Sequence, residues 1–245
     1  IESIFQTIPL YDDIVVRRIE DELSCVVKCD AMELPKENTL TKTYTLFSQF
    51  SGIKTGVFVE LTKRIPSGAG LGGGSSDASH TLLKLNEMFQ LGLSKDELAT
   101  YAAKLGADCA FFIYNTPMLA TGIGTDFSPI NISLKGYYMA LVKPNVFVST
   151  ADAYRRVTPK EPEFSLESLI NTPITEWKNI LVNQFEESVF AQFPLIADVK
   201  QRLYDAGAVY ASMSGSGSSV FGIFTEKPSI PTYIDCEAQF IMELQ

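Results

Sequence analysis

One segment of the chain, between residues 66 and 76, consists almost entirely of glycine and other small residues. It holds five glycines and three serines, and an apolar helical pattern follows it directly. Glycine is costly in a folded chain because it loses more backbone freedom on folding than other residues do. Such a loop is favoured where backbone N–H groups must approach a ligand closely, and the N-terminus of a following helix attracts phosphate. We therefore interpret the segment as a phosphate-binding loop rather than a flexible surface connection.

Three common types of phosphate-binding loop do not fit the segment. A Walker A loop needs Gly-Lys-Ser/Thr, which the segment lacks. Gly68, Gly70 and Gly73 satisfy the dinucleotide pattern G-x-G-x-x-G, but the acid near the required distance, Glu87, falls inside the following helical pattern. The same spacing occurs in protein kinases, yet the chain contains neither His-Arg-Asp nor Asp-Phe-Gly. The short glycine pattern alone is therefore weak evidence.

The composition narrows the class of protein. Lys plus Arg number 20 against 29 for Asp plus Glu, and the net charge of −9 argues against a nucleic-acid scaffold. Hydrophobic residues make up 46% of the chain, which is enough for a large core. No apolar run approaches the ~18 residues that span a bilayer, and no secretory signal opens the chain. Four cysteines and one histidine predict free thiols in the cytoplasm rather than a disulfide scaffold or a Cys/His zinc site.

The hydrophobic patterns mix strands and helices without regular alternation, which favours an α+β fold. Strands are expected at 1–8, 14–19, 24–29, 56–61, 111–120, 137–142, 209–213 and 220–224. Helices are expected at 38–50, 78–89, 94–105, 180–190 and 195–206. Ser94 and Glu97 form the capping box of the third of these helices. A second structural unit is expected from Gly136.

The longer string Pro-x-Gly-x-Gly-Leu-Gly-Gly-Gly-Ser-Ser, at residues 66–76, resembles the second motif of the GHMP kinases. The Ser-Ser-Asp-Ala continuation is most similar to the family branch that phosphorylates the 2-hydroxyl of 4-diphosphocytidyl-2-C-methyl-D-erythritol in non-mevalonate isoprenoid biosynthesis. Residues 106–112 resemble the family's Gly-Ala-Asp-x-Pro-Phe-Phe segment, with Ala110 in place of proline. Residues 213–218 resemble its third motif, which supports the phosphate loop from the second domain.

The resemblance covers nearly the whole chain and implies the architecture of the family. The implied N-terminal domain, at residues 1–135, is a ribosomal-protein-S5-like α+β domain that binds ATP. The implied C-terminal domain, at 136–245, is a ferredoxin-like α+β domain. The first N-terminal strands of the family have no counterpart in the chain.

The same resemblance implies an ATP-dependent small-molecule kinase, with Mg²⁺ accompanying ATP. The sequence contains no carboxylate cluster from which a protein ligand for the metal could be assigned. For Lys63, a solvated lysine at a strand end is the alternative. The residues implied to bind ATP are Asn38, Lys63, Pro66, Ser67, Gly68, Ala69, Gly70, Leu71, Gly72, Gly73, Gly74, Ser75 and Ser76.

Asp108 is the candidate catalytic base. Phosphoryl transfer needs a base for the proton of the acceptor hydroxyl, and Asp108 precedes an apolar Ala-Phe-Phe run that could exclude water. In a dry site the pKa of a carboxyl group rises towards that of a useful base. An ordinary turn aspartate is the alternative, and the resemblance favours the catalytic role.

The resemblance also implies a pocket for the cytidine end of the substrate, in which an aromatic ring stacks on the base. A core tyrosine is the alternative for Tyr154, and a surface arginine is the alternative for Arg155. His80 is off the apolar stripe of its helix and is expected to be exposed and without a catalytic role. The residues implied to bind the substrate are Phe5, Thr150, Tyr154, Arg155, Gly215 and Ser216.

The first motif of the family, with its catalytic lysine and a Gly-Tyr-His segment, lies upstream of the position of Phe5. An exposed strand edge at residue 1 would be costly, so we expect a truncated sequence of an active enzyme. The alternatives are another GHMP kinase, such as a homoserine kinase, and a non-catalytic binding module of the same fold. The upstream part of the open reading frame would separate these. The expected partner is the small-molecule substrate, without nucleic acid or membrane, and the expected protein is a monomer or homodimer.

Overall fold

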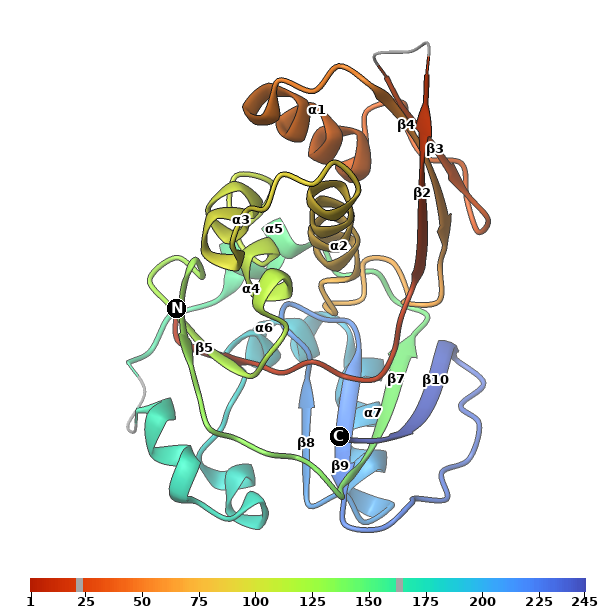
Figure 1. The fold of residues 1–245 in the computed structure, drawn as a ribbon. Coiled ribbons are helices and arrows are strands. Elements are labelled where there is room, and N and C mark those ends of the chain that lie inside the picture. The colour runs from red at the N-terminus through yellow and green to blue at the C-terminus, as the bar shows by residue number, and fades with distance from the viewer. Residues whose placement is uncertain (21–23, 162–164) are drawn as a thin grey trace. The chain divides into compact units, whose positions relative to one another are not determined.

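The computed structural model describes residues 1–20, 24–161 and 165–245, and its mixture of helices and strands matches the predicted α+β class (Figure 1). The chain forms two compact units. Unit 1 contains Ile1–Ile65 and Gly72–Pro129, and unit 2 contains Pro66–Leu71 and Ile130–Gln245. The domain boundary predicted at residues 135 and 136 stays a prediction.

The described residues of unit 1 form two small sheets. The first has the order β2-β4-β3, with β2 (Asp13–Ile19) antiparallel and β3 (Cys25–Cys29) parallel to the central β4 (Gly56–Thr62). The second is antiparallel, with the order β1-β5-β6. Its strands are β1 (Ser3–Phe5), β5 (Met118–Thr121) and β6 (Asp126–Pro129). The strand predicted over residues 1–8 is therefore confined to three residues.

The described residues of unit 1 also form the helices α1 (Thr39–Ser51), α2 (Gly73–Met88), α3 (Lys95–Ala102) and α4 (Cys109–Tyr114). In Figure 1, α1 and α2 lie beside the first sheet, where α1 packs against β3 and α2 against β2. The predicted capping box of Ser94 and Glu97 begins α3, and Asn38 forms a second one at α1. The predicted stripe on α2 is buried at Ala78, Leu82 and Leu85. Local patterns thus predict α1, α2 and α3 correctly, although α2 begins at Gly73 rather than at residue 78.

The strand predicted over residues 111–120 is wrong in its first half. Residues 109–114 form α4, and only Met118–Thr121 are a strand. Short apolar runs do not distinguish a buried strand from a buried helix, since neither periodicity is complete within them. Here Cys109, Ala110, Phe111 and Ile113 are buried, a set that fits one short helix packed against its neighbours.

Unit 2 is built on one antiparallel sheet with the order β10-β7-β9-β8. Its strands are β7 (Tyr138–Pro144), β8 (Tyr210–Met213), β9 (Val220–Phe224) and β10 (Cys236–Glu243). Its helical segments are α5 (Thr150–Arg156), η1 (Leu166–Asn171), η2 (Ile174–Asn179), α6 (Phe185–Gln192) and α7 (Pro194–Asp205). The face of α7 that carries Ile196, Val199 and Leu203 is buried, and α7 packs against β7, β8 and β9.

Two predictions for unit 2 need correction. The helix predicted from residue 180 begins only at Phe185, whose amide donates to the side chain of Asn183, as at a capped helix start. Strand β10 was not predicted, since its sequence mixes polar and apolar residues and exposed and half-buried positions follow without strict alternation. Within the described part of the chain, no helix has both the length and the apolarity to cross a membrane.

Candidate active site

Lys63, directly after β4 in unit 1, is buried between two carboxylates. Its Nζ atom donates to Oδ2 of Asp12 and lies 2.9 Å from Oδ2 of Asp77. The side chains of Lys63, Asp12 and Asp77 are 10%, 2% and 7% exposed, respectively. The alternative of a solvated lysine is therefore wrong.

The electrostatics of this cluster are those of one cation shared by two acids. Burial opposes ionisation of Asp12, but hydrogen bonds from Lys63 and from the amides of Ile65 and Arg64 hold its pKa below the ordinary value. Burial raises the pKa of Asp77 to about 6, and the bond from Lys63 offsets this only in part. Burial disfavours the charged Lys63, yet its two carboxylate partners keep its pKa above the ordinary value.

The same cluster holds the two chain segments that flank the glycine segment within unit 1. Oδ1 of Asp12 accepts from the amide of Ile65 at 2.8 Å, on the N-terminal side. Asp77 lies in α2, on the C-terminal side. Sequence reasoning missed both acids. The available signal was Lys63 itself, because a lysine beside an apolar strand needs a carboxylate partner once it is buried.

A cavity of about 280 Å³ opens beside this cluster in unit 1. His80 is exposed, as predicted, and its Nδ1 atom lies 2.9 Å from the carbonyl oxygen of Ser76. The cavity is lined by Leu10, Tyr11, Asp12, Ile14, Ile65, Ser76, Asp77, His80 and Lys84.

The backbone of the glycine segment offers hydrogen-bond donors. Gly68, Gly70 and Gly72 have positive φ angles of 61°, 74° and 66°. Among the described residues, no acceptor pairs with the backbone amides of residues 67–75. Helix α2 begins at Gly73, inside the segment, and its N-cap Gly72 supplies no side-chain cap. These amides and the start of a helix are the groups that bind phosphate in other proteins.

A turn of unit 2, residues 214–219, holds part of this segment. Oγ of Ser214 donates to the carbonyl oxygen of Gly70 at 2.8 Å, and the amide of Ser219 donates to the carbonyl oxygen of Ala69 at 3.1 Å. A Cβ atom on Gly70 would lie 2.2 Å from the carbonyl oxygen of Ser214. This position therefore requires glycine both for its φ angle and for the close approach of the turn.

Several residues predicted to bind the substrate meet in unit 2. Oγ1 of Thr150 lies 3.0 Å from Oγ of Ser216, next to Gly215 in the same turn. The half-exposed ring of Tyr154 packs edge-on against Phe185, with 4.8 Å between centroids. Arg155 lies on the surface, where it pairs with Asp152 at 2.8 Å.

Asp108 is the N-cap residue of α4 in unit 1. Its side chain makes no capping hydrogen bond, and burial raises the pKa of its carboxyl group. Such a carboxylate has lone pairs available to accept a proton from another molecule. Phe5, from the predicted substrate set, packs in unit 1 against Phe111 and Phe127, with centroid distances of 5.1 and 5.5 Å.

Asn38 caps α1 with its side chain. Oδ1 accepts from the amides of Leu40 and Thr41, and Nδ2 donates to the carbonyl oxygen of Pro35. The structure thus gives Asn38 a structural role at the helix start, and its contact with ATP stays a prediction.

Comparison with protein-family models decides the family. The GHMP kinase N-terminal domain matches residues 38–116, and the GHMP kinase C-terminal domain matches residues 165–231. The chain belongs to the GHMP kinase family. The predicted resemblance and the two-domain α+β architecture of the family are thereby confirmed.

Relatives of this GHMP kinase share most of its length. A 4-diphosphocytidyl-2-C-methyl-D-erythritol kinase of Bacteroides fragilis is 48% identical over 249 residues, covering 100% of this chain and 90% of its own. The enzyme of that name from Bacteroides thetaiotaomicron is also 48% identical, covering 94% and 85%.

Solved structures agree with these relatives. A crystal structure of 4-(cytidine 5'-diphospho)-2C-methyl-D-erythritol kinase has a TM-score of 0.76 at 30% identity, covering 91% of this chain and 80% of its own. A homoserine kinase from Cytophaga hutchinsonii has a TM-score of 0.71 at 24% identity, covering 87% and 76%, and shows the shared fold.

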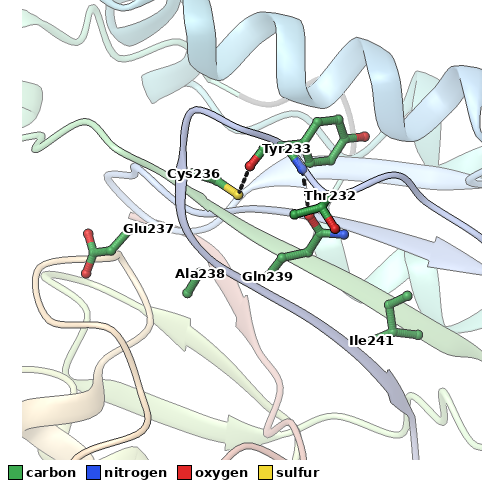
Figure 2. A pocket seen from close by; sticks show the side chains of 7 residues that line it. All are labelled: Thr232, Tyr233, Cys236, Glu237, Ala238, Gln239 and Ile241. Carbon is green, nitrogen blue, oxygen red and sulfur yellow. Dashed lines mark hydrogen bonds between the residues drawn. The ribbon is translucent and has the colours of Figure 1, made fainter.

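A second cavity of this GHMP kinase, about 470 Å³, lies on unit 2 along β10. Figure 2 shows its lining, where the thiol of Cys236 donates to the carbonyl oxygen of Tyr233 and the amide of Tyr233 donates to Oε1 of Gln239. None of the residues predicted to bind ATP or substrate lines this cavity. Its lining therefore adds nothing to the predicted site.

Proposed function

We propose that this GHMP kinase transfers the γ-phosphoryl group of ATP to the 2-hydroxyl of 4-diphosphocytidyl-2-C-methyl-D-erythritol. The observation that carries the proposal is the 48% identity to relatives of that name across the whole chain. The fold alone would not select this acceptor, since homoserine and mevalonate kinases share it.

The site residues support roles that this reaction needs. We assign the backbone amides of residues 67–75 to the phosphate oxygens of ATP, because no described residue pairs with them. We assign Asp108 as the base that accepts the proton of the 2-hydroxyl. The hydroxyl oxygen then bonds to the γ-phosphorus as the bond to ADP breaks and ADP leaves. The assignment is supported because the carboxylate of Asp108 is half-buried and makes no capping hydrogen bond to α4.

We assign the cytidine end of the substrate to unit 2. The ring of Tyr154 is half-exposed and so can stack on a base, and the turn with Gly215 and Ser216 lies beside Thr150. On the resemblance to the family, we also assign Arg155 of unit 2 and, separately, Phe5 of unit 1 to the substrate-binding residues. Lys63 and Asn38 are assigned to the nucleotide on the same ground.

Mg²⁺ is proposed to accompany ATP. Within the described residues no three His, Cys, Asp or Glu side chains gather into a metal site. Two carboxylates that flank the glycine segment, Asp12 and Asp77, are engaged by Lys63. We therefore assign the metal chiefly to the phosphate oxygens, which it would neutralise during transfer.

The cytoplasm is the proposed compartment. All four cysteines, each of them described by the structure, are free thiols. Free thiols of this kind are typical of a reducing environment.

The test is a substrate comparison with the protein of the complete open reading frame. Release of ADP would be followed with the cytidine substrate, homoserine and mevalonate as acceptors, and phosphorus NMR would locate the new phosphate. We expect turnover with the cytidine substrate alone and phosphate on its 2-hydroxyl. Turnover of homoserine or mevalonate instead would refute the acceptor, and nucleotide binding without any turnover would support a non-catalytic module.

A further inference from the structure

Side chains at the start of α6 in unit 2 form hydrogen bonds with the turn that follows β8. Asn183, two residues before α6, donates from Nδ2 to the carbonyl oxygens of Met213 and Gly215, both at 2.8 Å. Its Oδ1 atom accepts from the amide of Phe185 at 3.0 Å. One amide side chain therefore ties the helix start to two carbonyl groups of the turn.

Glu186, one turn further along, holds the same turn from a buried position. Its Oε1 atom accepts from the amide of Met213 at 2.8 Å and from Oγ of Ser212 at 3.2 Å. Its Oε2 atom pairs with Nζ of Lys200 at 2.5 Å. A carboxylate that is only 7% exposed needs such partners, because burial removes its oxygens from water.

Together the two side chains fix the backbone of Met213 at both its N–H and its C=O group. The residues that follow contact the predicted site directly. Oγ of Ser214 donates to the carbonyl oxygen of Gly70, and Oγ of Ser216 lies 3.0 Å from Oγ1 of Thr150. The orientation of the turn thus decides where the carbonyl of Gly70 is held.

We propose that Asn183 and Glu186 are positioning residues for the phosphate-binding loop. They act by fixing residues 213–215, so that Ser214 holds Gly70 and the neighbouring amides keep their direction towards the nucleotide. Neither residue is proposed to touch ATP or the acceptor. The inference rests on the proposed function, because it presumes that residues 67–75 bind the phosphates of ATP.

The first test compares Asn183→Ala and Asn183→Asp with Gln184→Ala. Gln184 is a matched control, since it precedes the same helix but exchanges its two hydrogen bonds with the backbone of Lys160 at 2.7 and 3.1 Å. We expect the KM for ATP to rise about tenfold in Asn183→Ala, the scale of one or two lost hydrogen bonds. Asn183→Asp should be worse, because it turns an acceptor towards two carbonyl oxygens. Gln184→Ala should leave the KM unchanged.

The second test uses Glu186. Glu186→Gln keeps an oxygen that can accept from the amide of Met213, whereas Glu186→Ala removes it. We expect Glu186→Gln to raise the KM for ATP less than Glu186→Ala does, with kcat changing less than KM in both. Thermal unfolding of each variant would report the purely structural cost.

The proposal is overturned if the Asn183 and Glu186 variants lower thermal stability while the KM for ATP stays within about twofold of that of the wild type. Calorimetric binding of a non-hydrolysable ATP analogue makes the test independent of the acceptor. A wild-type protein that binds the analogue but phosphorylates no cytidine substrate refutes the proposed acceptor, and analogue binding by the variants still decides the positioning role. A wild-type protein that binds no nucleotide refutes both.

Discussion

The Nζ atom of Lys63 lies 2.9 Å from Oδ2 of Asp77, although it already donates to Oδ2 of Asp12. All three side chains are nearly excluded from solvent. One positive charge thus serves two carboxylates, and the cluster carries one uncompensated negative charge when both acids are ionised. Ionising Asp12 costs less free energy than ionising Asp77, because Asp12 also accepts hydrogen bonds from backbone amides.

Asp77→Asn should change the pH dependence of stability. Burial raises the pKa of Asp77 from 3.8 to about 6, so between these values the folded protein holds more protons than the unfolded chain. The contribution of Asp77 to the free energy of unfolding therefore falls as pH rises through this window. We expect Asp77→Asn to be more stable than the wild type at pH 8, on the order of 1 kcal/mol, and the gain to shrink towards pH 4. Urea unfolding across this range checks it, and a difference independent of pH would contradict the charge argument.

Asp12→Ala should destabilise unit 1 strongly. The substitution leaves the amide of Ile65 without its acceptor and removes one of the two carboxylate partners of Lys63, which keeps only Asp77. We expect a loss of about 2 kcal/mol in the free energy of unfolding, within the range for a buried donor that loses its partner. Asp13→Asn is the neighbouring control, because Asp13 makes an exposed ion pair with Arg64 and should change stability little. If both substitutions changed stability equally, burial of the Asp12 cluster would not be the cause of its contribution to stability.

Asp108→Asn should abolish most of the chemistry while leaving ATP bound. Removal of the base is expected to lower kcat by ~10²–10⁴. Because burial raises the pKa of Asp108, the kcat of the wild type should fall, as pH falls, at a higher pH than an ordinary aspartate would give. Steady-state rates against pH check both points. Asp96→Asn, at an exposed position of α3, is the control and should keep wild-type turnover.

Gly70→Ala and Gly74→Ala should have opposite outcomes. The new Cβ atom at Gly70 would meet the carbonyl oxygens of Ser214 and Gly217 at 2.2 and 2.8 Å, at a φ angle of +74°. At Gly74, in the first turn of α2, nothing lies within 4 Å. We expect Gly70→Ala to lose nucleotide affinity or stability, and Gly74→Ala to gain up to about 1 kcal/mol of stability from helix propensity. Titration with an ATP analogue and thermal melts of both variants decide it, and tolerance of Gly70→Ala would disprove the close packing.

Tyr154→Ala should raise the KM for the cytidine substrate more than it lowers kcat. The proposed stacking of the half-exposed ring on a base is worth ~1–3 kcal/mol, which corresponds to about tenfold or more in KM. Tyr154→Phe retains the ring and its edge-on contact with Phe185 and should stay near the wild type. Initial rates over a range of substrate concentrations check this. Similar KM values for the alanine and phenylalanine variants would argue against stacking.

The local elements of this protein follow from its sequence. The capping boxes at Asn38 and Ser94 and the stripe on α2 were predictable, because caps and helical periodicity depend on neighbours a few residues apart. The glycine segment indicated a phosphate loop for the same reason, since its backbone freedom is a local property. The family followed from the longer string around it.

The tertiary structure decided what surrounds that loop. The partners of Lys63 are 51 and 14 residues away, and Ser214 contacts Gly70 across 144 residues. Asn183 reaches Met213 and Gly215 across 30 and 32 residues. No local pattern specifies such pairs, because a buried polar group needs any geometrically suitable partner and only the folded chain selects which one arrives. The sequence by itself thus determined the family and predicted a phosphate loop, whereas the packing of the folded chain decided which side chains hold the glycine segment in place.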